Sequence, residues 1–359
     1  MISKFDHFKK IYRRCALPFF PNSKAGLVCA TLLALTVALT LSTQPAVALQ
    51  DEGAAGKKIE KVRLGYSALS FAVLPLFLSA KQGFFNQENL AVELIQARSN
   101  VAIAAILSGH MQFTSATVSS AAAAARGVPM KVLAVMNNRA LQYVITKSDI
   151  TTPAQLKGKK ISVDSFGGTT HVIINQMLRN AGLNPEKDVQ VLGGADATAR
   201  FAQLKSGVVD ATMLSPPLLF VARNEGFRIL SSAKNMPELP STGLATSEAL
   251  LREKPEQVTK MLRAFVRGLV FLRENRDETI RYAMELLKLN RVVAEESYDL
   301  SRDCYSKDGG IGDQGFQLVI ELQRDREGIG AKNIPVTQMA NFAPLREVQK
   351  QLRAAGVLK

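Results

Sequence analysis

The stretch LSGHMQFT, residues 107–114, recurs later in the chain as KSGVVDAT, residues 205–212. The similarity extends upstream, where AKQGFF (80–85) matches RNAGL (179–183) and an apolar segment follows each. Each copy predicts a strand, a helix ended by a glycine suited to the left-handed conformation, a second strand, another helix, then Ser-Gly and a third strand. The repeat therefore predicts an α/β protein with two similar lobes.

The expected lobes are joined by two crossings, near residues 145–149 and 233–243. Residues 61–145 are assigned to lobe 1 and residues 146–238 to lobe 2. Residues 239–359 are expected to return to lobe 1 and to add C-terminal helices, because apolar residues there recur at helical spacing. Two such lobes leave a cleft at the carboxyl ends of both sheets, where open α/β folds bind ligands.

The N-terminus predicts export from the cytoplasm. Basic residues precede an uncharged run at 25–41, and Ala46-Val47-Ala48 supplies the small-x-small pattern that signal peptidase cleaves. We expect residues 1–48 to be a signal peptide cleaved near Ala48, residues 49–60 to be a flexible leader, and the mature protein to be periplasmic. The run is close to the length that spans a bilayer, so a retained anchor remains an alternative.

Composition limits the function classes. The chain carries a formal charge of +14, which falls to about +9 without the signal peptide and favours encounter with anions. No Lys/Arg run is interleaved with aromatic residues, so no nucleic-acid partner is expected. Cys304 is the only cysteine left, expected to be a buried small apolar group. His110 and His171 lie in no metal-ligand motif, so we expect neither a metal nor a cofactor.

The sharpest local feature is SFGGTTH at residues 165–171, a glycine-rich loop that follows a predicted strand and opens a helix. Hydroxyls and backbone N–H groups at a helix N-terminus suit a carboxylate, sulfonate or phosphate, whereas an ordinary N-cap is the alternative. The repeat places SALS (67–70) in the matching loop of lobe 1. It pairs SATV (115–118) with SPP (215–217) after the third strands. These residues also favour ordinary turns.

The candidate ligand-binding residues are Ser67, Leu69, Ser70, Phe71, Ser115, Ala116, Thr117, Asn137, Asn138, Gly167, Gly168, Thr169, Thr170, His171, Ser215 and Pro216. Arg98 and Arg139 each follow a predicted strand and could bind an anionic ligand through the guanidinium fork, or could be surface residues. The ligand is expected to be a small organic molecule, anionic rather than cationic.

Five segments, taken in order, resemble the nitrate/taurine/alkanesulfonate/thiamine-precursor branch of periplasmic substrate-binding proteins of ABC importers. They are KVRLGY (61–66), KQGFF (81–85), AILSG (105–109), LKGKKI (156–161) and SGVVDA (206–211). The resemblance implies the type II periplasmic-binding-protein fold, in which each lobe is a mixed, mostly parallel sheet with flanking helices. It also implies a solute-binding component that delivers its ligand to an ABC permease and ATPase; we expect a monomer.

Two departures from the family pattern stand out. Gln112 replaces the acidic residue that usually follows the first Ser/Ala-Gly element, whereas Asp210 keeps it in the second copy. Tryptophan is absent from the chain, so an aromatic ligand would have to stack on Tyr66, Phe71 or Phe166.

No motif for catalysis occurs in the sequence: there is no G-x-S-x-G, G-x-G-x-x-G, phosphate-loop Lys-Ser, H-E-x-x-H or Cys-His pair. We therefore expect a protein that is not an enzyme. Two alternatives remain open. One is a ligand-sensing extracytoplasmic domain. The other is an enzyme resembling the pyrimidine-precursor synthases, which share this fold family but carry a cysteine-rich motif that is missing here.

Overall fold

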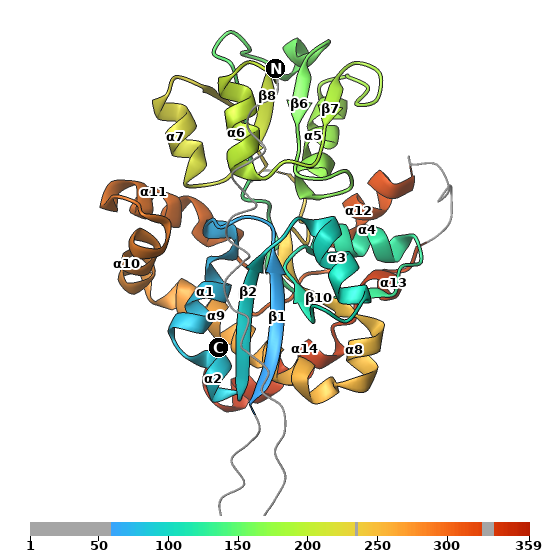
Figure 1. Cartoon of the computed structure of the whole chain (residues 1–359), viewed down its shortest axis with the longest axis vertical. Helices are drawn as coiled ribbons and strands as arrows, with labels where there is room; N and C mark the ends of the chain where they lie inside the picture. Colours follow the sequence, from blue (N-terminus) through green and yellow to red (C-terminus); the bar gives the residue numbers. More distant parts are fainter. Residues whose placement is uncertain (1–58, 234–235, 325–333) are drawn as a thin grey trace, which may run out of the picture. The chain divides into compact units, whose positions relative to one another are not determined.

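The computed structural model describes residues 59–233, 236–324 and 334–359. The predicted signal peptide, its cleavage site and nearly all of the predicted leader lie outside these residues. Two five-stranded mixed sheets with flanking helices form the described chain (Figure 1). The predicted two-lobe α/β fold is confirmed.

The first sheet has the order β2-β1-β3-β10-β4. Its strands are β1 (Glu60–Tyr66), β2 (Leu90–Gln96), β3 (Phe113–Thr114), β4 (Met130–Asn137) and β10 (Thr242–Ser247). β1 is parallel to β2 and β3, and β10 is antiparallel to β3 and β4. The register places Leu64 opposite Leu94 on one side and Phe113 on the other, so apolar side chains meet across the sheet.

The second sheet repeats this order as β7-β6-β8-β5-β9. Its strands are β5 (Tyr143–Thr146), β6 (Lys160–Ser162), β7 (Gln190–Leu192), β8 (Ala211–Leu214) and β9 (Arg228–Ser232). β6 is parallel to β7 and β8, and β5 is antiparallel to β8 and β9. The predicted repeat is therefore a repeat of topology, with β1, β2 and β3 corresponding to β6, β7 and β8.

The first crossing lies earlier than the sequence predicted. Residues 143–145 were assigned to lobe 1, but β5 pairs with β8 from Tyr143 to Thr146, so the chain crosses between Asn137 and Tyr143. All four residues of β5 are buried. Their apolar pattern fits the centre of either sheet, so it does not indicate which sheet they join.

The helices fall into two groups. The first lobe, built on the first sheet, contains α1 (Leu74–Lys81), α2 (Phe84–Gln87), α3 (Ser99–Leu107), α4 (Thr117–Ala125), α8 (Glu248–Glu253), α9 (Pro255–Glu274), α10 (Arg276–Leu287), α11 (Arg291–Ser301), α12 (Gln314–Arg324), α13 (Val336–Met339) and α14 (Ala343–Ala354). The second lobe, built on the second sheet, contains α5 (Thr169–Asn180), α6 (Ala197–Lys205) and α7 (Leu218–Asn224). Short 3₁₀ helices lie at Phe71–Val73, Pro153–Leu156 and Arg302–Cys304.

Glycines end the repeated helices as predicted. Gly83 and Gly182 have φ of 70° and 76°, and Gly109 and Gly207, in the Ser-Gly elements, have φ of 78° and 77°. Side chains larger than hydrogen are strained in this left-handed region. The same turn therefore follows corresponding helices in both lobes.

The predicted helical stripe of the C-terminal region forms the core of the first lobe. Val258, Phe265 and Leu269 of α9 are fully buried. α1 approaches α9 closely, because the Ser79 hydroxyl donates to the Ala264 carbonyl at 3.0 Å. Cys304 is buried, as predicted. Within the described ranges, no helix has both the length and the apolar character needed to cross a bilayer.

Candidate ligand-binding site

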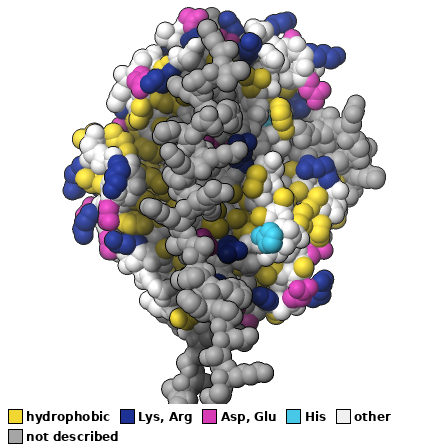
Figure 2. All heavy atoms as spheres, in the orientation of Figure 1, with side chains coloured by type: hydrophobic (Ala, Val, Ile, Leu, Met, Phe, Trp, Pro, Cys, Tyr) yellow, Lys and Arg dark blue, Asp and Glu magenta, His cyan; other side chains and the backbone are white. Residues whose placement is uncertain are grey.

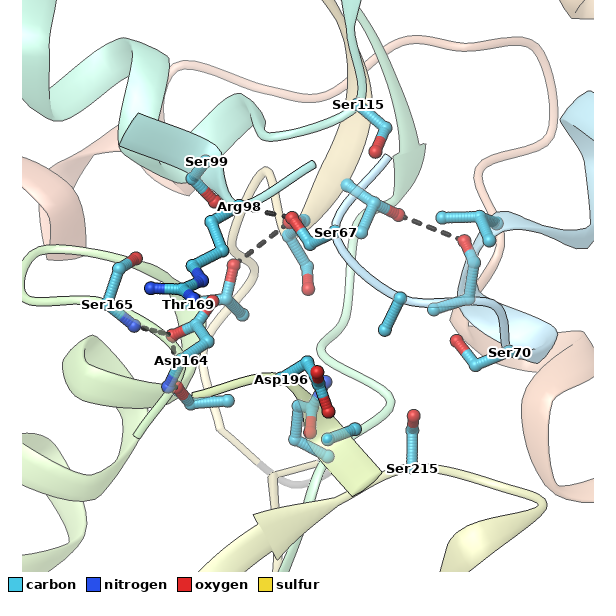
Figure 3. Close-up of a pocket in the computed structure, with 18 of the residues that line it drawn as sticks. Ser67, Ser70, Arg98, Ser99, Ser115, Asp164, Ser165, Thr169, Asp196 and Ser215 are labelled. Atoms are coloured by element: carbon cyan, nitrogen blue, oxygen red, sulfur yellow. Dashed lines mark hydrogen bonds between the residues drawn. The ribbon is translucent and has the colours of Figure 1, made fainter. Parts of the chain in front are cut away.

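A cavity of about 80 Å³ lies where strand ends of the two sheets face each other (Figure 3). First-lobe residues that line it are Ser67, Ala68, Ser70, Ala72, Val73, Arg98, Ser99, Ser115, Ser241 and Thr242. Second-lobe and crossing residues that line it are Gln142, Asp164, Ser165, Thr169, Thr170, Ala195, Asp196, Ala197, Arg200 and Ser215. Most of them are in loops at strand ends or in the first turns of helices, where the two-lobe fold was expected to bind its ligand.

Part of the predicted site lines this cavity. The lining residues among the candidates are Ser67, Ser70, Ser115, Thr169, Thr170 and Ser215. Ser67 follows β1, and its hydroxyl lies 3.3 Å from the hydroxyl of Ser99 in the first turn of α3. Ser115 follows β3, and Ser215 follows the corresponding strand β8. The repeat thus identified matching serines that the fold brings to one cavity.

The other candidates do not line the cavity. They are Leu69, Phe71, Ala116, Thr117, Asn137, Asn138, Gly167, Gly168, His171 and Pro216. Phe71 is fully buried in the core of the first lobe, and the Thr117 hydroxyl donates to the Pro240 carbonyl. The ring of His171 packs edge-on against Phe166, with centroids 5.3 Å apart, and its Nδ1 accepts from the Gly167 N–H at 3.1 Å. Phe71, Thr117 and His171 therefore make their contacts within the protein.

Asn137 and Asn138 join the two crossings. The Asn138 side-chain amide donates to the Glu238 carboxylate at 3.2 Å, and the Asn138 carbonyl accepts from the Leu239 N–H at 2.9 Å. The Asn137 carbonyl accepts from the Ser241 N–H at 3.0 Å. The outgoing and returning segments are therefore held side by side.

The glycine-rich loop is organised around a carboxylate that the sequence reasoning missed. Asp164 Oδ1 accepts from the Ser165 N–H at 2.8 Å and from the Thr170 hydroxyl. The Thr169 hydroxyl donates to the Ser241 carbonyl at 3.0 Å. A Cβ on Gly168 would lie 2.5 Å from Ser165 Oγ and 2.9 Å from Asp164 Oδ1, so glycine at this position lets both side chains lie close to the loop backbone. Both threonine hydroxyls thus donate hydrogen bonds within the protein.

Asp196 and Arg200 form the second part of the missed site. Asp196 Oδ1 caps α6 by accepting from the Ala199 N–H at 2.9 Å. Arg200, one turn later, is only 4% exposed and donates to the carbonyls of Ala195 at 2.8 Å and Met213 at 3.1 Å. Burial lowers the pKa of Arg200, and the nearby carboxylates of Asp164 and Asp196 oppose that shift.

Three buried polar atoms of lining residues have no hydrogen-bond partner among the described residues: Gln142 Oε1, Ser165 Oγ and Arg200 Nε. Buried polar groups in proteins are normally hydrogen-bonded, because an unmade bond leaves their desolvation cost uncompensated.

One face of the molecule shows how surface charges are distributed. On the face drawn in Figure 2, Lys and Arg side chains are interspersed with acidic ones instead of forming one patch. Among the residues that the structure covers, no group of three or more His, Cys, Asp or Glu could hold a metal ion.

Comparison with known proteins agrees with this architecture. Riboflavin-binding protein RibY of Chloroflexus aurantiacus is 24% identical over 300 residues, which cover 79% of this chain and 85% of RibY. The alkanesulfonate-binding protein SsuA of Xanthomonas axonopodis pv. citri, bound to MOPS, superposes with a TM-score of 0.65 at 17% identity, covering 80% of this chain and 99% of SsuA. The desulfurization enzyme DSZB also has this fold, with a TM-score of 0.55 at 14% identity over 81% of this chain and 99% of DSZB.

The structural neighbours therefore share the two-lobe fold but include both binding proteins and an enzyme. The family is decided by the sequence itself. The family model described as NMT1/THI5 like matches residues 70–279. This segment begins at Ser70, in the loop after β1, and ends within α10, so it contains all strands from β2 to β10. Because the match covers more than half of the 359 residues, the chain belongs to the NMT1/THI5-like family.

Proposed function

We propose that this protein is the solute-binding component of an ABC importer. It captures a small organic molecule in the cavity between the lobes and delivers it to a membrane permease coupled to an ATPase. The observation that carries the proposal is the cavity itself, which both lobes line with polar and charged side chains. Its volume of about 80 Å³ suits a small ligand.

The proposal includes the location and the movement of the protein. Removal of residues 1–48 would release a periplasmic monomer, and the segments at 138–142 and 236–241 would act as hinges. Closure on a ligand would then need no change within either sheet. The ligand is proposed to carry an anionic group, which Arg98 is placed to bind.

A thermal-shift screen of the mature protein tests the binding function, because a ligand that binds the folded state raises Tm by mass action. The screen contains sulfonates, carboxylates, nitrate, pyrimidines, small amines and, because of the name of RibY, riboflavin. Ser67→Phe, which places a ring in the cavity, should abolish the shift of any hit. Ser108→Phe, at an exposed position on the same lobe, is the matched control and should retain it.

Mass spectrometry of the bound molecule separates this function from the alternatives. A ligand recovered chemically unchanged supports a binding protein, whereas conversion of the ligand would support an enzyme. Full-length protein recovered with an intact N-terminus would favour an anchored sensor domain. A screen in which no small molecule shifts Tm would contradict the proposed function.

A further inference from the structure

The two walls of the cavity carry opposite net charge. Among the first-lobe residues that line it, Arg98 is the only charged one. The second-lobe wall contains Asp164, Asp196 and Arg200, so one guanidinium faces two carboxylates and one negative charge remains. The cavity is thus neutral as a whole but positive on one wall and negative on the other.

Asp164 is a fixed acceptor. Its Oδ1 is held by the Ser165 N–H and the Thr170 hydroxyl, and its backbone N–H donates to Thr170 Oγ1 at 2.9 Å. Its Oδ2 makes no hydrogen bond to the residues that the structure describes. An acceptor held in this way loses little conformational entropy when a ligand donates to it.

The same carboxylate changes what the start of α5 can bind. A helix N-terminus favours a negative charge. Asp164 already supplies that charge, because its carboxylate lies against Thr170 in the first turn of α5. The glycine-rich loop therefore offers an incoming ligand an acceptor as well as donors, and a simple anion placed there would meet a like charge.

The Arg98 side chain is available to pair with a ligand in the cavity. Its side chain is exposed and makes no hydrogen bond or ion pair with the described residues. It reaches across to the second lobe, since a Cβ on Gly194 would lie 3.9 Å from its Nη1. In Figure 3 it extends toward the loop that carries Asp164 and Ser165.

We propose that the ligand is a small zwitterion whose anionic group binds Arg98 on the first lobe and whose protonated amine binds Asp164 and Asp196 on the second. This inference rests on the proposed binding function. A zwitterion neutralises both walls at once and links the two lobes. A simple anion makes no contact with the negative wall and a simple amine makes none with Arg98, so each gains only one of the two charged contacts.

Matched probes test the charge class. 3-Aminopropane-1-sulfonate is compared with propane-1-sulfonate and propylamine, and 3-aminopropanoate with propanoate, by calorimetric titration of the mature protein. We expect the aminosulfonate or the aminocarboxylate to bind at least about tenfold more tightly than its singly charged counterparts, since a singly charged probe loses one of the two charged contacts and a factor of ten corresponds to about 1.4 kcal/mol. A singly charged probe that binds as tightly as its zwitterionic partner would overturn the proposal.

Variants assign the selectivity to Asp164. Asp164→Asn keeps the Oδ1 acceptor for Ser165 and Thr170 and should remove the preference for the zwitterion, because it weakens binding of the zwitterion and lifts the like-charge repulsion that the simple anion meets. Asp149→Asn, at an exposed position of the same lobe, should leave both affinities unchanged. Arg98→Gln, at a side chain without a partner in the described chain, should weaken the zwitterion and the anion alike.

An unchanged zwitterion preference in folded Asp164→Asn would also overturn the proposal. If only uncharged or singly charged molecules bind, including riboflavin or a pyrimidine in the broader screen, the binding function stands and the charge class is refuted. If no molecule in either set binds, the binding function itself fails.

Discussion

Asp210 is expected to stabilise the second lobe in a pH-dependent way. Its Oδ1 accepts from Lys147 Nζ at 2.8 Å, and its Oδ2 accepts from the Lys160 N–H at 3.0 Å. Burial raises the pKa of Asp210, but the hydrogen bonds from Lys147 and Lys160, together with the charges of Lys147 and Lys159, outweigh burial and place the pKa below its ordinary value. The carboxylate therefore ties the start of β8 to β5 and β6.

The substitution Asp210→Asn retains an acceptor for the Lys160 N–H but removes the charge paired with Lys147. The Lys147 side chain is 38% exposed and that of Asp210 is 21% exposed. The pair thus lies between an exposed ion pair, worth about 0.2–1 kcal/mol, and a buried charged hydrogen bond, worth about 1.5–3 kcal/mol. We expect the variant to lose about 1 kcal/mol of unfolding free energy at neutral pH.

The sign of the pH dependence follows from the lowered pKa. The unfolded state takes up the proton more readily, so the contribution of Asp210 is fully present above the unfolded pKa and disappears as the pH falls through the lower folded pKa. Urea unfolding of both proteins at neutral pH and at about pH 3.5 measures the difference. Asp149→Asn is the control. Equal stability of Asp210→Asn and wild type at neutral pH, or a difference that does not shrink in acid, would refute the reasoning.

Two further substitutions test the core and the contact between the lobes. Gly268→Ala would place a Cβ 2.0 Å from Ser79 Oγ and 2.5 Å from a backbone oxygen, and should lower the free energy of unfolding in urea by about 1–3 kcal/mol. Gly312→Ala, whose Cβ would meet no atom of the described residues within 4 Å, is the control and should leave the free energy of unfolding unchanged. A Gly268→Ala protein that is more stable than wild type would contradict the close packing of α1 on α9. Arg223→Gln removes the two hydrogen bonds, of 2.7 and 3.1 Å, that link α7 to Glu296 of α11 across the lobes. Because exposed ion pairs are worth less than about 1 kcal/mol, ligand affinity should fall by no more than about fivefold. Small-angle scattering should show a more open ligand-free protein. Unchanged scattering would show that this ion pair does not hold the lobes together.

The repeat made most of the fold predictable from the sequence. It also explains why glutamine can replace the usual acidic residue at position 112. Gln112 Oε1 accepts from the Arg63 N–H at 2.8 Å, just as Asp210 Oδ2 accepts from the Lys160 N–H in the second lobe. The amide therefore makes the same strand-to-strand hydrogen bond without a charge. The first crossing was misplaced because the apolar strand β5 fits the middle of either sheet.

The site was only partly predictable because its charged members depend on contacts that the sequence does not show. Serines at strand ends could be found by matching the two copies. Asp164 has a weak signal, as an acid directly after a strand, and Asp196 has the pattern of a helix cap. Arg200 lies inside a helix, where a charged residue is expected to be exposed. Its burial becomes evident only when β8 and the loop after β7 are placed around it.

The late position of β10 in the sequence has a consequence for folding during synthesis. The second sheet is built from one continuous segment, β5 to β9, whereas the first sheet needs β10, which follows that entire segment in the sequence. During synthesis from the N-terminus, the second lobe can therefore be completed first. In the first lobe, β3 and β4 cannot pair with β10 until residue 247 has been synthesised. Chaperones would be needed longest at these exposed strand edges, because an unpaired edge is prone to aggregation.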